Sequence, residues 1–224
     1  MGGILQLFDF ILHIDAYLFL LIQDYGIWIY AILFLIIFVE TGLVFMPLLP
    51  GDSLLFAAGT FCAGVMQENE MAQLNLWVVL SLLIVAAIAG DAVNYLIGKH
   101  FGLKLAKVKI KNYQLINDKH LDKTHAFFEK HGPKTIIIAR FVPIVRTFAP
   151  FVAGIAQMRY PTFFRFNAFG GTIWVISLTL LGYFFGNLSF VRENFETVIF
   201  GIIGLSLLPM VFAFIQEKLK TKAN

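Results

Sequence analysis

Charged residues are scarce in this sequence. Asp, Glu, Lys and Arg make up 14% of the 224 residues, whereas soluble domains average about 25%. Residues 166–191 and 197–216 contain no charged residue at all, and residues 71–98 contain only Asp91. Since about 20 apolar residues span a bilayer, and the mean hydropathy is +0.80, the composition predicts an all-α, polytopic membrane protein and excludes a soluble enzyme.

Cysteine is also nearly missing. The single residue, Cys62, excludes an intrachain disulfide and a cysteine metal cluster. Four of the five histidines fall in residues 99–134, where no cysteine accompanies them, so we expect no metal site and no cofactor. The N-terminus lacks a basic region and is interrupted by Asp9 and Asp15, which argues against a cleaved signal peptide. No feature predicts a nucleic-acid partner.

The positive charges are concentrated in one segment. Residues 99–134 hold nine lysines against three acidic residues, which predicts a cytoplasmic location that faces anionic lipid. Lysines near the C-terminus place that end on the same side, whereas the acidic loops at 66–73 and 188–196 are expected outside. The predicted order in one membrane domain, 1–224, is a first half at 1–98, the cytoplasmic segment 99–134, a second half at 135–187 and a final transmembrane helix at 197–216.

Proline breaks two further apolar segments. Residues 135–158 would reach about 36 Å as a helix, which suffices for one crossing of about 30 Å but not for two. This segment contains Pro143 and Pro150, so a re-entrant hairpin is the simplest interpretation. Its counterpart is predicted near 27–65, where Pro47, Pro50 and Gly51 break the helix; that longer segment could instead cross twice.

An internal repeat supports the pairing of the two segments. FMPLLP at 45–50 matches FVPIVR at 141–146, and both are followed by an Ala-Gly pair, at 58–59 and 153–154. The helix after each hairpin ends in GxxxG, at 98–102 and 182–186. Inverted repeats with broken helices are typical of secondary transporters, although coincidence in an apolar sequence is the alternative. Residues 1–24 and 108–131 would be matching interfacial helices, and whether 1–24 instead spans stays open.

Four charged residues lie within or beside the hairpins: Glu40, Asp52, Arg140 and Arg146. Unpaired in a bilayer they would cost about 10–14 kcal/mol together, so they are expected to pair or to face water. One interpretation is two structural ion pairs that join the halves. The other uses the fact that a carboxylate can accept a proton while arginine keeps its own. Protonation of Glu40 and Asp52 would leave the arginines to bind an anion such as phosphate.

Three weaker candidates complete the predicted site. Asp91 lies in a membrane helix near Asn94 and Tyr95, where it would tie helices together or titrate as a third carboxylate. Ser53 and Thr147 could donate hydrogen bonds to a ligand, or could satisfy the backbone next to the prolines. These residues are treated as supporting ones.

The hairpin sequences ETGLVFMPLLPGDSLLFAAG and ARFVPIVRTFAPFVAG, with GDAVNYLIGKHFG and LDKTHAFFEKHGPKTIIIARF between them, resemble the DedA family of bacterial inner-membrane proteins. The resemblance covers nearly the whole chain. It implies a fold shared with eukaryotic lipid scramblases and a role in envelope homeostasis that depends on the proton-motive force. Some members are linked to recycling of undecaprenyl phosphate. The functional acidic residues of the family match Glu40 and Asp52, and its paired arginines match Arg140 and Arg146.

These observations favour a proton-coupled translocator of an anionic lipid, of the polyprenyl-phosphate type, in the inner membrane. Its partners would be membrane lipids and protons, and a homo-oligomer stays open. A proton-coupled exporter of small molecules or cations and a non-transporting assembly factor are the alternatives. We expect no enzymatic activity, because the hairpins hold no histidine and the chain shows no lipid-phosphatase-like set of basic residues, serine and histidine.

Overall fold

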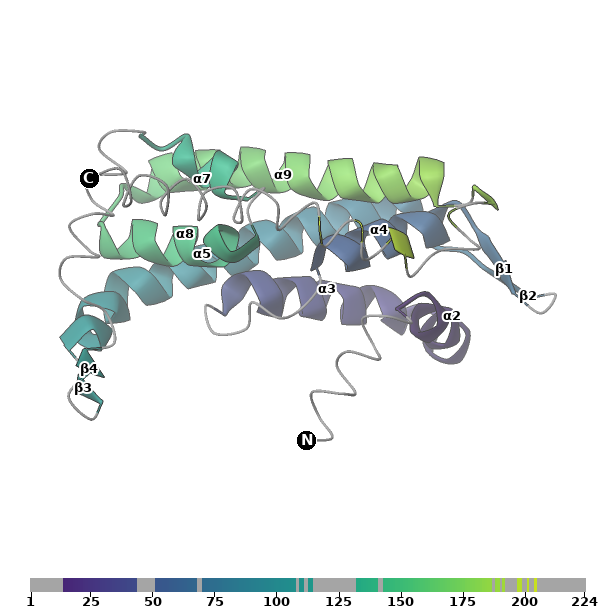
Figure 1. Ribbon diagram of the computed structural model, residues 1–224, viewed down its shortest axis with the longest axis horizontal. Coiled ribbons are helices and arrows are strands. Elements are labelled where there is room, and N and C mark those ends of the chain that lie inside the picture. Colours follow the sequence, from purple (N-terminus) through teal and green to yellow (C-terminus); the bar gives the residue numbers. More distant parts are fainter. Residues whose placement is uncertain are drawn as a thin grey trace, which may run out of the picture. The chain divides into compact units, whose positions relative to one another are not determined.

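A computed structural model of the chain describes residues 14–43, 51–67, 70–107, 109–110, 113–114, 132–140 and 143–186, with isolated positions between 188 and 204. Helices dominate it, as predicted (Figure 1). They are α2 (Ile14–Tyr25), α3 (Trp28–Gly42), α4 (Gly51–Cys62), α5 (Leu76–Lys107), α7 (Thr135–Ala139), α8 (Pro143–Ile155) and α9 (Tyr160–Phe185).

The expected all-α fold needs one correction, because two short antiparallel hairpins interrupt the helices. Strand β1 (Val65–Gln67) pairs with β2 (Glu70–Ala72), and β3 (Lys109–Ile110) pairs with β4 (Tyr113–Gln114). The first hairpin follows α4 at Gly64, whose φ of 90° lies in the region that favours glycine. This residue lets the chain leave the helix and turn into a strand.

Two of the described helices are long and apolar enough to cross a membrane. They cover Leu76–Gly102 in α5 and Tyr160–Phe185 in α9. The helix expected near 74–98 is longer than predicted, because α5 continues to Lys107 into the segment expected to be a cytoplasmic loop. Most of the predicted final helix at 197–216, and residues 1–13 and 115–131, lie outside the described residues.

Proline acts differently at its two described hairpin positions. Pro143 is the first residue of α8, where its missing N–H would have no helical partner in any case. Pro150, which was expected to break the helix, instead lies inside α8, although a proline there removes one backbone hydrogen bond. Gly51 begins α4, and Pro47 and Pro50 lie outside the described residues.

The chain divides into two compact units. Unit 1 comprises Met1–Leu33, Pro50–Leu82 and Val175–Asn224, and unit 2 comprises Phe34–Leu49 and Leu83–Trp174. Helices α3, α5 and α9 contribute residues to both. Each unit therefore combines segments from distant parts of the sequence.

Unit 1 is built on a close contact between α4 and the C-terminal half of α9. A Cβ at Gly59 would clash with the carbonyl oxygen of Thr179, and a Cβ at Gly182 would clash with that of Phe56. The hydroxyl of Thr60 donates to the Gly182 carbonyl at 3.4 Å. Only glycine at these positions lets the two backbones touch.

Unit 2 repeats this contact between α8 and α5. A Cβ at Gly154 would clash with the carbonyl oxygen of Tyr95, and a Cβ at Gly98 would clash with that of Phe151. The two Ala-Gly pairs and the two GxxxG sequences thus meet crosswise. In unit 1, α4 from the first half of the sequence packs on α9 from the second half. In unit 2, α8 from the second half packs on α5 from the first half.

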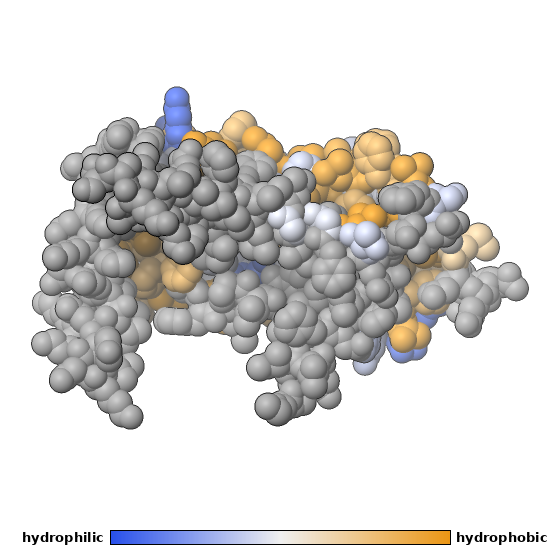
Figure 2. Space-filling view, viewed as in Figure 1, coloured by the Kyte–Doolittle hydropathy of each residue, from blue (hydrophilic) through white to orange (hydrophobic). Residues whose placement is uncertain are grey.

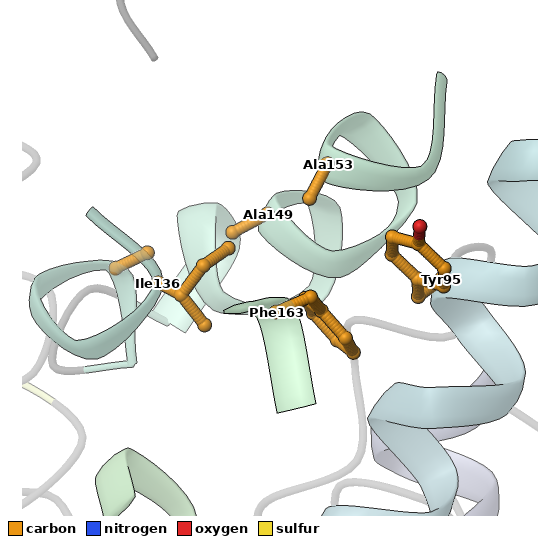
Figure 3. Packing of buried hydrophobic residues seen from close by; sticks show 6 residues of the cluster. Tyr95, Ile136, Ala149, Ala153 and Phe163 are labelled. Atoms are coloured by element: carbon orange, nitrogen blue, oxygen red, sulfur yellow. The ribbon is translucent and has the colours of Figure 1, made fainter. Parts of the chain in front are cut away.

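The apolar core of unit 2 lies beside this contact (Figure 3). Tyr95 from α5 stacks on Phe163 from α9, with ring centroids 4.4 Å apart. Its hydroxyl donates to the Met158 carbonyl, so the buried phenol is satisfied. Ile136 from α7 and Ala149 from α8 belong to the same cluster, which fixes the broken segment against α5 and α9.

Candidate functional site

Unit 2 buries four charged side chains that come from different elements. Glu40 and Arg146 are 1% and 6% exposed, and Asp91 and Arg140 are each 3% exposed. Glu40 lies near the end of α3, Asp91 on α5, Arg140 in the turn after α7, and Arg146 in the first turn of α8. Four separate elements therefore bring charge into the interior of the unit.

The four charges form two ion pairs. Arg146 donates from Nη2 to Oε1 of Glu40 at 2.5 Å, and Arg140 donates from Nη2 to Oδ2 of Asp91. Ionised, the four groups sum to zero. The pairing meets the requirement that buried charges be compensated, and the carboxylate that pairs with Arg140 is Asp91.

The guanidinium of Arg140 lies against two glycines of α9. A Cβ at Gly170 would lie 3.2 Å from Cδ of Arg140, and a Cβ at Gly171 would lie 3.2 Å from its Nη2. The same Nη2 also donates to Oδ1 of Asn167. Among the residues that the structure describes, Nε and Nη1 of Arg140 have no hydrogen-bond partner. The guanidinium therefore keeps unused donors of the kind that bind carboxylate or phosphate oxygens.

Trp174 of α9 brings the two arginines together. Its ring lies 4.6 Å from Cζ of Arg146 and 5.9 Å from Cζ of Arg140, within the range of cation–π attraction. Two guanidinium groups over one indole form a concentrated positive site, which the two carboxylates neutralise.

One amide side chain links the helices that carry Glu40 and Arg146. Nδ2 of Asn94 donates to the carbonyl of Thr41 at 3.0 Å and to the carbonyl of Thr147 at 2.8 Å. These acceptors directly follow Glu40 and Arg146 in the sequence. Asn94 therefore fixes the spacing of the backbones on both sides of the ion pair, and Thr147 takes part through its carbonyl.

Two of the predicted residues belong to the other unit. Asp52 and Ser53 belong to unit 1, where both are in the first turn of α4. A carboxylate suits that position because the helix N-terminus carries partial positive charge. Ser53 is buried. The structure thus joins Glu40 with Arg146, and Arg140 with Asp91, while the convergence of Asp52 on the same cavity stays a prediction.

Sequence reasoning missed Asn167 and Trp174 as parts of this site. Both lie in the uncharged stretch 166–191, which was interpreted only as a membrane span. An amide in such a stretch, next to the Gly170-Gly171 pair, is a signal that a buried polar partner lies opposite. No group of three or more His, Cys, Asp or Glu side chains that could hold a metal ion occurs within the described part of the chain.

Comparison with known proteins identifies the family of this chain. The VTT domain family matches residues 49–184. Protein DedA of Escherichia coli K12 is 53% identical over 212 residues, which cover 95% of this chain and 94% of that protein. The uncharacterized membrane protein ML0287 of Mycobacterium leprae is 45% identical over 80% of this chain and 76% of its own length. Inner membrane protein YqjA of E. coli K12 is 36% identical over 70% of this chain and 68% of its own length.

No solved structure matches the chain. The matched residues 49–184 include Asp52, Arg140 and Arg146, which are three of the four charged residues predicted from the hairpin sequences. Both arginines form ion pairs in unit 2. The resemblance seen in the hairpin sequences is confirmed, and the chain belongs to the VTT-domain family of membrane proteins that includes DedA.

Proposed function

We propose that this chain is a proton-coupled translocator of an anionic lipid in the bacterial inner membrane, and not an enzyme. Polyprenyl phosphate is the first candidate substrate, and the two broken segments would enter the membrane as re-entrant hairpins. The observation that carries the proposal is the buried pair Arg140 and Arg146. Each is held by one carboxylate, and Arg140 keeps two unused nitrogen donors on its guanidinium.

The geometry of Arg140 favours anion binding over a purely structural role. A buried ion pair stabilises a fold only when its remaining donors are also satisfied, and an unsatisfied buried N–H costs about 1–3 kcal/mol. In the described part of the chain, Nε and Nη1 of Arg140 lack partners. A phosphate group, with several acceptor oxygens, could satisfy these donors where a single carboxylate does not.

Proton coupling would act through the carboxylate partners. Glu40 faces Arg146 of α8, and Asp91 and Arg140 form the second pair. Trp174 of α9 lies against both arginines, and Asn94 of α5 binds the backbone next to Arg146. Protonation of Glu40 would release Arg146 to a phosphate, and deprotonation would return it. Asp52, in the first turn of α4, remains the second coupling candidate from the sequence.

Transfer of lipid between leaflets tests the proposal. The purified full chain would be reconstituted into liposomes with a fluorescent short-chain polyprenyl phosphate, under an imposed pH gradient. A quencher added outside would remove the fluorescence of labelled lipid in the outer leaflet, so the loss of fluorescence over time measures transfer. Arg140→Ala should slow transfer by about tenfold or more, and Arg140→Lys should restore it only in part because an ammonium lacks the fork. Arg159→Ala, at an exposed arginine, is the matched control.

The carboxylates have their own arm of the experiment. Glu40→Gln should keep phosphate-lipid binding but lose the dependence of transfer on the pH gradient. Normal transfer with an unchanged pH dependence in Glu40→Gln would rule out coupling through this residue. Transport of a soluble cation without lipid transfer would instead favour an exporter, and arginine variants that only fail to fold would favour a structural role.

A further inference from the structure

A cleft on unit 2 lies apart from the buried ion pairs. It has a volume of about 570 Å³ and lies between α9 and α7 with its preceding turn. Its lining consists of Lys134, Ile137, Ile138, Arg165, Phe166 and Phe169. Figure 2 shows hydrophobic surface along the edge that α9 occupies, with a hydrophilic projection at its end near α7.

The walls of the cleft are almost entirely apolar, and two cationic side chains border them. Four of its six lining residues are aliphatic or aromatic, and the other two are the cations Lys134 and Arg165. Ile138 is 66% exposed and Phe169 is 60% exposed, so the apolar walls are open rather than covered by the rest of the unit. Arg165 and Phe169 are four residues apart on α9, which places cation and ring on one helix face.

The geometry points to a binding site for an anionic phospholipid, with its phosphate on Lys134 and Arg165 and the start of its acyl chains on Ile138 and Phe169. Charge complementarity selects the ligand, because the lining contains two positive side chains and no acidic one. A soluble anion would use the cations but leave the apolar walls in contact with water. A cleft of this volume is within the usual range for small-ligand sites, about 300–1,000 Å³.

The position of the cleft relates it to the buried site of the same unit. Ile137 lines the cleft, and its backbone lies 3.3 Å from where a Cβ of Gly170 would be, beside the Arg140 side chain. Ile137 therefore belongs both to the lining of the cleft and to the contact with α9 beside Arg140. A role as the lateral entrance to the translocation site rests on the proposed function, whereas lipid binding in the cleft does not.

Native mass spectrometry on the purified full chain tests the site, with phosphatidylglycerol as the anionic probe and phosphatidylcholine as the neutral one. Lys134→Gln and Arg165→Gln should each weaken phosphatidylglycerol binding by about fivefold, and the double variant by about 30-fold. Lys134→Arg and Arg165→Lys should retain binding. Arg159→Gln, at another exposed arginine of the same region, should leave it unchanged.

Two comparisons separate lipid binding in the cleft from anion binding at the buried ion pairs and from binding of free phosphate. Arg140→Ala should leave phosphatidylglycerol binding in the cleft unchanged even where it abolishes transfer, so failure of one proposal does not imply failure of the other. Inorganic phosphate at millimolar concentration should not displace the lipid. The inference is overturned if the double glutamine variant binds phosphatidylglycerol like the parent while remaining folded by circular dichroism, if phosphatidylcholine binds equally well, or if free phosphate competes.

Discussion

The α4–α9 contact of unit 1 and the α8–α5 contact of unit 2 share a pattern of one phenylalanine and two glycines. Phe56, Gly59 and Gly182 in the first correspond to Phe151, Gly154 and Gly98 in the second. The correspondence ends at the charges. Seven residues before Gly98 is Asp91, the partner of Arg140, whereas seven residues before Gly182 is the buried Val175.

This difference distinguishes the glycine contacts that both units share from the buried charges of unit 2. Close glycine contacts let backbones approach and do not require any particular chemistry beside them. Unit 2 adds two buried ion pairs and the Asn94 amide to that scaffold, and these additions are unfavourable unless they are compensated. Unit 2 therefore carries a buried polar network on the glycine contacts that both units share.

Breaking the glycine contacts should have the largest effect. Gly98→Leu and Gly182→Leu each place a side chain against a backbone carbonyl and should lower the free energy of unfolding by about 5 kcal/mol or more. Thermal unfolding in detergent, followed by size-exclusion chromatography, measures this. Gly201→Leu, where nothing lies within 4 Å of the added Cβ, is the control. A large loss in only one of the two variants would contradict the equivalence of the contacts.

Removing one charge from unit 2 should come next. Arg140→Leu leaves Asp91 buried without its cation and should cost about 3–5 kcal/mol of stability. The double variant Asp91→Leu/Arg140→Leu should recover most of that loss, because neither charge remains. Chemical unfolding of the parent, both single variants and the double variant gives the coupling energy. Additive losses would show that the two residues do not interact.

The Asn94 amide should have an intermediate effect. Asn94→Leu removes two hydrogen bonds to buried carbonyls, those of Thr41 and Thr147, and should cost about 2–4 kcal/mol. Since the amide spaces the backbones of Glu40 and Arg146, transfer activity should fall further than stability alone explains. Val93→Leu, at a neighbouring exposed position of α5, should change stability by about 0.5 kcal/mol or less. Equal effects of the two variants would exclude the bridging role.

The smallest effect should come from making the two contacts alike. Thr60 in unit 1 corresponds to Ile155 in unit 2, where the side chain lies against Gly102 as Thr60 lies against Gly186. Thr60→Ile removes hydrogen bonds to Phe56 and Gly182 but adds apolar packing, so stability should change by about 1 kcal/mol or less. Thermal unfolding checks this, and a loss of several kcal/mol would show that the hydroxyl is essential.

The sequence predicted where the repeated elements lie better than it predicted which helices contact each other. The FxP and GxxxG patterns located α8 and the contact glycines because short-range patterns reflect local backbone requirements. The crossed contacts could not be predicted, since a glycine face fits any close helix. In the same way, Arg140 had more than one available carboxylate in the sequence, and the tertiary position of α5 selects Asp91. Asn167 was missed because its partner, Arg140, is 27 residues away.

The crossed packing also sets an order of events during synthesis. The α8–α5 contact can form as soon as α8 leaves the ribosome, because α5 precedes it in the chain. Helix α4 has to wait for α9, and the bond from Thr60 to Gly182 joins residues 122 positions apart. At about 5–20 residues per second, that interval lasts on the order of 10 s. During that interval the face of α4 that carries Gly59 has not yet met its partner α9. Unit 1 is therefore the later of the two units to complete its helix contacts.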